Sequence, residues 1–455
     1  MTGHRLTGRA AAFAAAAALI VLLAGCSKEV VPETYQPTPD HESYVRSLER
    51  AALDETALGR DWLEAAESAL DSPISVEPPY QEQVYFDPSE ASGVGYRFSA
   101  RRGQNVVVEV EPDGELRLYL DLYREETRSE TYVHVASAPE DENRLELHVQ
   151  SDSTYVLRLQ PELLRGGTFN VSIRVGPSLA FPIQGLDTKS IFSWFGAPRD
   201  GGTRRHEGVD ILAPRGTEVV APIRAYVRWV GINRRGGNVV GLTDEKYGLY
   251  LYFAHLEEQI AKSGTYVEPG DVLGTVGNTG NAVTTVPHLH FGVYMRTSGR
   301  RSAVDPFYYL YDPKKQMAEI TADTSLLGEW ARSSAAAALR EPAEPDSGSA
   351  ETPLAVHTLF RILAAAAGGY RVRLPDGRRG YLDAGAVEAL TEPLEVERIE
   401  TETALLANPD SLASVITRTR AGQRLEILAG FEEFLYVRVE NGSPGWIPAD
   451  QRSLL

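Results

Sequence analysis

The sequence predicts a mainly β protein of several domains, with a helical hairpin near its N-terminus. Its 455 residues are enough for about three domains of ~150 residues each. Apolar and polar residues alternate over long stretches after residue 80, whereas helical spacing of apolar residues appears before it. Hydrophobic residues make up 43% of the chain and charged residues 24%, so the composition excludes a wholly disordered protein.

The first 26 residues have the pattern of a signal peptide. Arg5 and Arg9 precede the uncharged run Ala10–Leu23, which at 14 residues is too short to cross ~30 Å of hydrocarbon as an ordinary helix. The run ends in Leu-Ala-Gly-Cys26, which resembles the bacterial lipobox. This resemblance implies that Cys26 is lipidated and anchors the protein to a membrane, and Ser27 implies the outer membrane, facing the periplasm. A plain secretory signal with an incidental cysteine is the alternative.

The charge and the cysteine count exclude several classes of protein. The chain has 45 basic and 63 acidic residues, a net charge of −18, which argues against a nucleic-acid binder. Its single cysteine excludes an intramolecular disulfide and a cysteine-based zinc cluster. Any metal site must therefore use His, Asp or Glu side chains.

Residues 27–80 are predicted to form a tether followed by a helical hairpin. Three prolines among polar residues, between 32 and 39, favour an extended tether. Asp40 is a candidate cap for a first helix, and a second helix is expected over about 61–70, ending before Pro73. The apolar residues at helical spacing are Tyr44, Val45, Leu48, Ala52, Trp62, Leu63, Ala66 and Leu70.

Residues 81–178 are predicted to form an antiparallel β-sandwich, because apolar residues recur there with a period of two. The clearest runs are Val106, Val108, Val110, then Leu116, Leu118, Leu120, Leu122, and then Phe169, Val171, Ile173, Val175. The region loosely resembles the prepeptidase-C-terminal-type sandwiches of secreted bacterial enzymes. His134 and His148 lie in these strands and are interpreted as surface or hydrogen-bonded residues, not as ligands.

The C-terminal part contains an internal repeat. Residues 360–390 align without a gap on residues 425–455, and the second copy resembles the bacterial SH3 domain of cell-wall enzymes. We therefore expect a degenerate SH3-like domain over 325–392 and a second SH3-like domain over 395–455. Phe431, Phe434, Tyr436 and Trp446 are interpreted either as a platform for a wall ligand or as core residues of a small barrel.

The histidines of the central region point to a metal site. His288 and His290 lie two residues apart on an apolar segment that reads as a strand, so both imidazoles face one side. His206 and Asp210 also share one side of an extended segment. A catalytic zinc takes three N or O ligands and leaves one position open for water, which two His and one Asp can supply.

A helical zinc-protease motif is excluded for the same residues. His206-Glu207 begins like the HExxH motif, but Asp210 stands where the second histidine is required, and Gly208 disfavours the helix. Glu207 is therefore interpreted as a solvated neighbour and not as the general base.

Residues 181–311 resemble the M23 (LytM/lysostaphin-type) zinc endopeptidases nearly end to end. The matching segments are His206-Glu-Gly-Val-Asp-Ile-Leu-Ala-Pro, Phe253-Ala-His-Leu, Gly277-Asn-Thr-Gly-Asn and Pro287-His-Leu-His-Phe-Gly, among others. The resemblance implies an antiparallel β peptidase domain that cleaves the cross-link peptides of peptidoglycan. Some relatives also carry a tyrosine shortly before the first zinc histidine, but residues 199–205 contain none.

The same resemblance implies a role for each of five residues. His206, Asp210 and His290 would bind Zn²⁺, and His255 and His288 would be the catalytic pair. One of the pair would take a proton from the attacking water and the other would stabilise the oxyanion, and the sequence leaves that division open.

The sequence therefore predicts a lipid-anchored zinc endopeptidase of bacterial peptidoglycan. The alternative is a catalytically silent envelope scaffold that activates a wall amidase or binds the wall through its SH3-like modules. The presence of all five site residues favours the enzyme.

Overall fold

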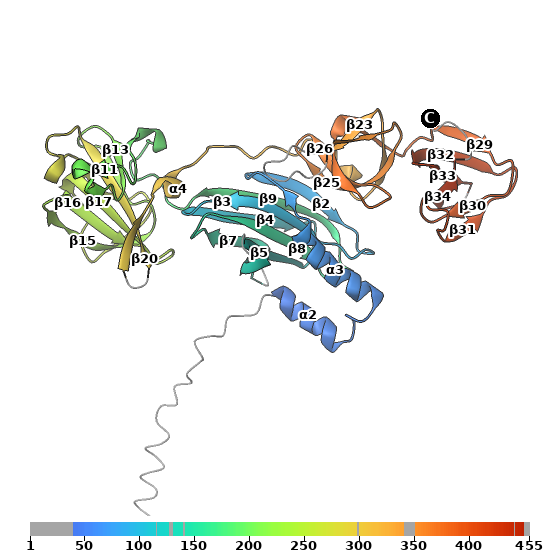
Figure 1. Ribbon diagram of the computed structural model, residues 1–455, viewed down its shortest axis with the longest axis horizontal. Helices are drawn as coiled ribbons and strands as arrows, with labels where there is room; N and C mark the ends of the chain where they lie inside the picture. The colour runs from blue at the N-terminus through green and yellow to red at the C-terminus, as the bar shows by residue number, and fades with distance from the viewer. Residues whose placement is uncertain are drawn as a thin grey trace, which may run out of the picture.

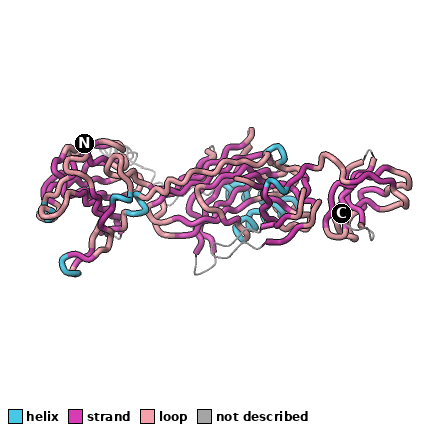
Figure 2. The backbone as a smooth tube through the Cα atoms, turned by 90° about the horizontal axis from the view of Figure 1, so that it is seen from above, coloured by secondary structure: helices cyan, strands magenta, loops and turns pink. Residues whose placement is uncertain are grey.

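The computed structural model confirms the prediction of a mainly β protein (Figures 1 and 2). Cys26 and the whole signal segment lie outside the described residues. Within the described part of the chain, no helix is long and apolar enough to cross a membrane. The described residues are 40–114, 116–126, 131–139, 142–297, 300–340, 351–440 and 442–449.

Two helices, α2 (Asp40–Arg50) and α3 (Ala57–Asp71), precede the first strand. Helix α3 begins four residues earlier than expected, because the Thr56 hydroxyl accepts a hydrogen bond from the Gly59 amide at 3.0 Å and caps the first turn. Trp62 anchors the helix to the β structure, since its indole is buried and donates to the Pro161 carbonyl at 2.9 Å.

Two sheets pack face to face in the next part of the chain. Valines 106, 108 and 110 and leucines from both sheets share one buried core, as the period of two predicted. The first sheet has the order β1 (Ile74–Ser75), β3 (Val94–Ala100), β8 (Ser153–Pro161), β5 (Leu118–Glu126) and β6 (Thr131–Ser137). The second contains β2 (Tyr80–Phe86), β9 (Gly167–Pro177), β4 (Gln104–Pro112) and β7 (Arg144–His148).

The second sheet does not end at residue 178, where the sequence placed a domain boundary. Strand β2 pairs with β25 (Leu359–Ala366) of the first C-terminal copy, with Val84 opposite Ala364. The two regions therefore share one continuous sheet.

A buried ion pair reinforces this junction. Glu82 on β2 has no exposed surface, and Arg371 donates to its carboxylate from Nη2 at 2.7 Å. The Tyr80 and Tyr96 hydroxyls donate to the same carboxylate at 2.8 and 2.5 Å. Burial and the charge of Glu82 raise the pKa of both phenols, which keeps them as donors.

The two C-terminal copies have the same strand order, shifted by 65 residues. Strand β25 corresponds to β32 (Arg424–Phe431), and both carry a bulge at the same place, after Ile362 and Ile427. The first copy contains β22 (Trp330–Ser333), β23 (Ala337–Arg340), β24 (Glu351–Leu354), β26 (Gly369–Arg373), β27 (Arg379–Asp383) and β28 (Val387–Ala389). The second contains β29 (Glu395–Arg398), β30 (Ala404–Leu406), β31 (Val415–Arg418), β33 (Phe434–Val439) and β34 (Pro444–Pro448).

The aromatic residues of the second copy pack against the first copy. Phe431, Tyr436 and Trp446 are buried in one apolar cluster with residues of the first copy, and Trp330 lies 6.1 Å from Tyr436 between ring centroids. This packing covers the three rings and argues against the ligand platform, but it places them between the two copies. The second copy has a separate apolar cluster made of Leu405, Leu425, Ile427, Val437 and Val439.

The histidine-rich region folds as a single antiparallel sheet at the other end of the molecule, followed by the short helix α4 (Phe307–Leu310) (Figure 1). Strands β14 (Glu218–Val220), β19 (Val272–Val276) and β21 (Arg300–Val304) pair at its sides. The main order is β10 (Ile191–Ser193), β13 (Val209–Leu212), β20 (His288–Thr297), β17 (Leu249–Gln259), β16 (Gly237–Thr243), β15 (Ala225–Asn233) and β18 (Tyr266–Val267).

A polar contact joins this sheet to β4 and β7. Tyr247 stacks on His148 with ring centroids 4.1 Å apart, and its hydroxyl accepts a hydrogen bond from Asn105 at 2.6 Å. His148 Nδ1 lies 3.2 Å from the Asn105 side-chain oxygen, whereas its buried Nε2 has no partner within the described residues. Burial therefore lowers the pKa of His148 and favours the neutral ring.

The first prediction concerns the Glu82–Arg371 pair. Arg371→Met should lower the free energy of unfolding by ~3–5 kcal/mol, because it leaves a buried carboxylate without its cation. Arg101→Met is the matched control, since the Arg101–Asp152 pair is more than half exposed and exposed pairs contribute about 0–1 kcal/mol. Urea unfolding of both variants is the measurement, and equal losses would contradict the assignment.

The second prediction concerns pH. The folded state lowers the pKa of His148. The contribution of the neutral ring to the free energy of unfolding is therefore fully present above the unfolded-state pKa of about 6.5, and it is lost as the pH falls below that value. His148→Phe keeps a ring against Tyr247 but cannot ionise, so its melting temperature should fall less than that of the parent between pH 7.5 and 5.5. An unchanged pH dependence of the melting temperature in His148→Phe would refute the idea.

Candidate metal centre

The register of two neighbouring strands creates the centre. Strands β13 and β20 are antiparallel, and Asp210 lies directly opposite His290. His206 precedes β13 and is held by backbone hydrogen bonds in both directions, from its amide to the Ala197 carbonyl and from the Gly196 amide to its own carbonyl. Residues far apart in the sequence thus meet on one face of the sheet.

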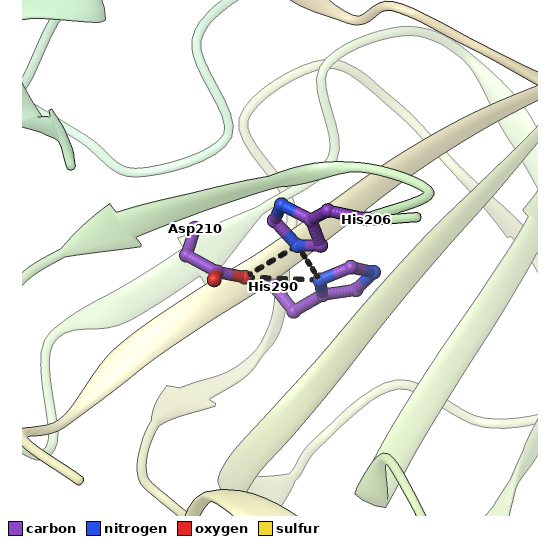
Figure 3. Close-up of side chains that lie close together, drawn as sticks. All are labelled: His206, Asp210 and His290. Carbon is purple, nitrogen blue, oxygen red and sulfur yellow. Dashed lines mark hydrogen bonds and ion pairs between the residues drawn. The ribbon is translucent and has the colours of Figure 1, made fainter. Parts of the chain in front are cut away.

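Three side chains converge closely enough to hold a metal ion (Figure 3). Asp210 Oδ1 lies 3.0 Å from His206 Nε2 and 3.0 Å from His290 Nδ1, and the two ring nitrogens are 3.0 Å apart. His206 Nδ1 lies 2.9 Å from the Trp194 carbonyl, so Nε2 is left for the centre. Two imidazoles and one carboxylate form the donor set of a catalytic zinc, and the group therefore fits that metal.

The electrostatics of the centre keep Asp210 ionised. Burial would raise its pKa, but hydrogen bonds from His206 and His290 hold the pKa of Asp210 well below its usual range. Burial also lowers the pKa of His290 and favours its neutral form. A deprotonated carboxylate and a neutral imidazole are the forms that bind a metal ion.

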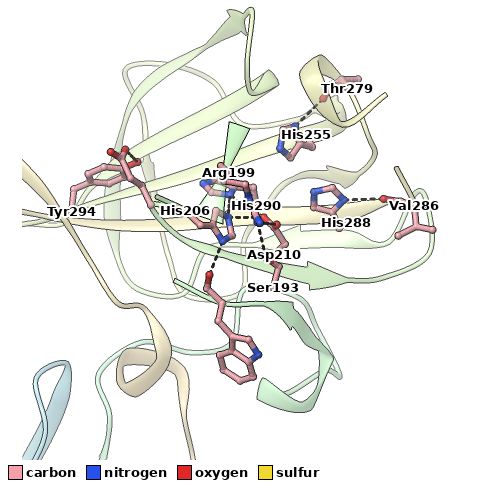
Figure 4. A network of polar contacts seen from close by, with 12 residues as sticks. Ser193, Arg199, His206, Asp210, His255, Thr279, Val286, His288, His290 and Tyr294 are labelled. Carbon is pink, nitrogen blue, oxygen red and sulfur yellow. Dashed lines mark hydrogen bonds and ion pairs between the residues drawn. The ribbon is translucent and has the colours of Figure 1, made fainter. Parts of the chain in front are cut away.

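His255 and His288 lie beside this group, with their ring planes tilted by 60° to one another (Figure 4). Nδ1 of His255 hydrogen-bonds to the Thr279 carbonyl and Nδ1 of His288 to the Val286 carbonyl, each at 2.8 Å. Because carbonyls only accept, both rings carry their proton on Nδ1 and leave Nε2 as an acceptor. The ring centroids are 5.0 Å apart, and burial lowers the pKa of His255 to about 4.

His255 has an unusual backbone conformation for a residue with a side chain. Its φ is 65°, in the left-handed region, and its amide donates to the Gly236 carbonyl at 2.7 Å. Gly237, the residue after Gly236, also has a positive φ of 62°. A Cβ on Gly237 would lie 2.3 Å from the Thr279 hydroxyl oxygen. This strained corner turns the imidazole toward the centre, and the same Thr279 supplies its carbonyl partner.

Residues 204–306 match the profile of Peptidase family M23. This part of the chain is an M23 peptidase domain of the LytM/lysostaphin type. The chain is similar to L-Ala--D-Glu endopeptidase of Bacillus subtilis (strain 168), with 38% identity over 139 residues that make up 29% of this chain and 42% of the relative. It is also similar to peptidoglycan DD-endopeptidase ShyC of Vibrio cholerae, with 33% identity over 116 residues, 25% of this chain and 26% of the relative.

A solved structure is also similar to part of this chain. The catalytic domain of lysostaphin from Staphylococcus simulans has 32% sequence identity, covers 25% of this chain and 85% of its own, and has a TM-score of 0.23. The chain spans less than half the length of the two curated relatives above.

The sequence analysis overlooked one residue of the M23 domain, Arg199. It lies on β11 (Pro198–Arg199), which pairs with β12 (Arg204–Arg205), and its Nη2 donates to Asp210 Oδ2 at 2.8 Å and to the Ser193 hydroxyl at 2.6 Å. Asp210 thus offers Oδ1 to the histidines and Oδ2 to an arginine. No sequence motif marks Arg199, because it is one of several charged residues in the segment before His206.

The M23 domain surrounds these residues with a cleft of about 460 Å³. Arg204 and Arg235 lie on its walls, and Phe192 packs edge-on against His288 with ring centroids 5.5 Å apart. Glu207 is exposed and lies 3.5 Å from the Tyr294 hydroxyl, outside the metal-binding group, which agrees with its interpretation as a solvated neighbour. The structure thus brings all five predicted residues to one cleft.

Proposed function

We propose that the protein is a zinc-dependent endopeptidase that hydrolyses the cross-link peptides of bacterial peptidoglycan. The observation that carries this proposal is the arrangement of a His–Asp–His group beside two histidines whose Nε2 atoms are both free to accept a proton. The names of two similar proteins, an L-Ala--D-Glu endopeptidase and a peptidoglycan DD-endopeptidase, support wall peptides as the substrate class.

His206, Asp210 and His290 would hold the zinc ion. When bound there, zinc supplies Lewis-acid chemistry that lowers the pKa of water and polarises a carbonyl. The protein contributes the orientation of the ligands, because the Trp194 carbonyl fixes His206 and the Arg199 guanidinium fixes Asp210.

His255 and His288 would move the protons of the reaction. Each ring has Nδ1 fixed on a backbone carbonyl, so a proton from the attacking water can be accepted only at Nε2. The resulting imidazolium can return that proton to the leaving amine nitrogen. The other ring could donate to the developing oxyanion only after it takes up a second proton at Nε2.

The cleft favours an extended peptide with a carboxylate. Arg235 adds positive charge to its walls and has no carboxylate partner among the described ion pairs, whereas Arg204 is paired with Asp200 and Glu207 adds a negative charge to the same walls. The exposed aromatic ring of Phe192, which packs against His288, offers apolar surface at the cleft. Wall stem peptides carry both methyl groups and free carboxylates, which match these two features.

We infer that the remaining parts position this activity. A lipid on Cys26 and the tether before α2 would attach the protein to the outer membrane of the cell envelope, facing the periplasm. The two C-terminal copies, with matching strands and bulges, are proposed to be SH3-like barrels. Their buried aromatics do not favour a wall-binding platform at those residues.

The third prediction separates metal ligands from proton carriers. His206→Ala, Asp210→Ala and His290→Ala should each lose most bound zinc, whereas His255→Ala should keep zinc and lose about 10²–10⁴-fold in activity. Zinc content by mass spectrometry and muropeptides released from purified sacculi are the measurements. His134→Ala is the control and should retain both, while equal zinc loss in His255→Ala would make His255 a ligand.

The fourth prediction concerns Arg199. Arg199→Ala should weaken zinc binding by about 10–100-fold, as expected when a partner of a ligating carboxylate is removed. Arg199→Lys should give an intermediate loss, because it keeps the charge but not the two simultaneous hydrogen bonds to Asp210 and Ser193. Arg204→Ala is the matched control on the same hairpin, and chelator competition measures all three. An unchanged affinity in Arg199→Ala would show that Asp210 needs no support.

The fifth prediction concerns the anchor. Cys26→Ser should move the protein from the membrane to the soluble envelope fraction, because several acyl chains on one residue provide the membrane affinity. Fractionation followed by immunodetection tests this, and continued membrane association would place the anchor elsewhere.

A further inference from the structure

The wall of the histidine cleft contains a tyrosine that has had no role so far. Tyr252 on β17 lines the cleft, and its ring centroid lies 6.0 Å from that of His290, with the ring planes at 72°. Its partner on β20 is Gly292, so no side chain stands opposite the phenol on that strand. The phenol therefore borders open space in the cleft beside the metal-binding group.

Asn233 fixes the direction of the hydrogen bond that the phenol makes. The Asn233 side-chain oxygen accepts from the amides of Arg235 and Gly236 at 3.1 and 2.7 Å. Because backbone amides only donate, these two contacts define which atom of Asn233 is the oxygen. Its Nδ2 then donates to the Tyr252 hydroxyl at 2.9 Å. The hydroxyl is thus the acceptor in this bond, and its own proton has no acceptor among the described residues.

The groups around this hydroxyl belong to the cleft. Asn233 and Gly236 line it together with Tyr252, and a Cβ on Gly236 would lie 2.3 Å from the hydroxyl oxygen. The Gly236 carbonyl also accepts from the His255 amide at 2.7 Å. The hydroxyl therefore adjoins the corner that presents His255. Since a phenol has a pKa of about 10, it keeps its proton at neutral pH and remains a donor.

We propose that the Tyr252 hydroxyl donates a hydrogen bond to a backbone carbonyl of the bound peptide, beside the scissile bond, and so sets the position of the peptide in the cleft. The inference rests on the proposed peptidase function. Tyr252 lies two residues along β17 from Ala254, which is opposite His290. The donor is therefore displaced along the sheet from the metal-binding group. Carbonyls recur every ~3.3 Å along an extended peptide, so a neighbouring residue of the substrate can offer the acceptor.

The first test removes the hydroxyl alone. Tyr252→Phe should lower kcat/KM for a cross-linked stem-peptide dimer about 3–10-fold, the effect of one neutral hydrogen bond. Tyr250→Phe is the matched control, because Tyr250 lies on the same face of β17, does not line the cleft and makes no hydrogen bond through its hydroxyl among the described residues. Zinc content and melting temperature of both variants should match those of the parent.

A second variant separates a contact with the peptide from mere support of the cleft wall. Asn233→Asp keeps an oxygen for the amides of Arg235 and Gly236, and it keeps a hydrogen bond to Tyr252. The direction of that bond is reversed, however, because a carboxylate accepts the phenolic proton. The proposal predicts that Asn233→Asp loses activity as Tyr252→Phe does, and that the two losses do not add in the double variant. A purely structural bond predicts parental activity in Asn233→Asp.

Calorimetric titration of the zinc-free full chain with the same peptide dimer measures the contact without cleavage. Tyr252→Phe should bind the dimer about 3–10-fold more weakly than the parent, and Tyr250→Phe should bind it equally well. Cleavage by the parent with equal affinity and activity in Tyr252→Phe would overturn this inference alone, as would parental activity in Asn233→Asp. A parent that neither binds nor cleaves the dimer would overturn the proposed function and this inference with it.

Discussion

The pairing of β13 with β20 is the constraint on which the candidate site depends. It sets Asp210 opposite His290, and the period of two then places His288 on the same face. A slip of one residue would turn both histidines into the apolar core and bring Leu289, which is fully buried, to the cleft. Ile211 and Phe291 are also fully buried on the other face, so the hydrophobic core enforces the register that the chemistry needs.

The middle sheets connect the two ends of the molecule by different kinds of contact. Toward the M23 domain, the contact is mostly polar: His148 stacks on Tyr247, and Lys246 reaches Glu146 at 2.8 Å, with the buried ring of Tyr309 against Gly103 as its apolar part. Toward the first C-terminal copy, it is a continuous sheet with a fully buried ion pair. Sub-global opening is expected where few apolar contacts are buried. The M23 domain should therefore separate from the middle sheets more easily than the C-terminal copy does.

Local patterns in the sequence predicted the features that depend on local spacing. Alternating valines gave the buried face of β4, and the shared parity of His288 and His290 gave one wall of the cleft. The joining of β2 to β25 could not be predicted in this way, because nothing in either strand specifies which edge it pairs with. Arg199 was missed for a related reason: its importance comes from the loop that brings it to Asp210, and an arginine among other charged residues carries no local signal.

The cost of burying Glu82 and Arg371 bears on why the junction contains charge at all. Apolar residues of similar volume are often as stable as a buried ion pair or more so. An apolar β2 edge, however, would also accept other strands, whereas Glu82 is tolerated only where Arg371 and the hydroxyls of Tyr80 and Tyr96 are all in place. The second C-terminal copy has the same strand order and carries Tyr436 at the position of Arg371, so it offers no guanidinium to Glu82. The buried pair thus distinguishes the first copy from the second at the edge of β2, which sheet pairing alone would not do.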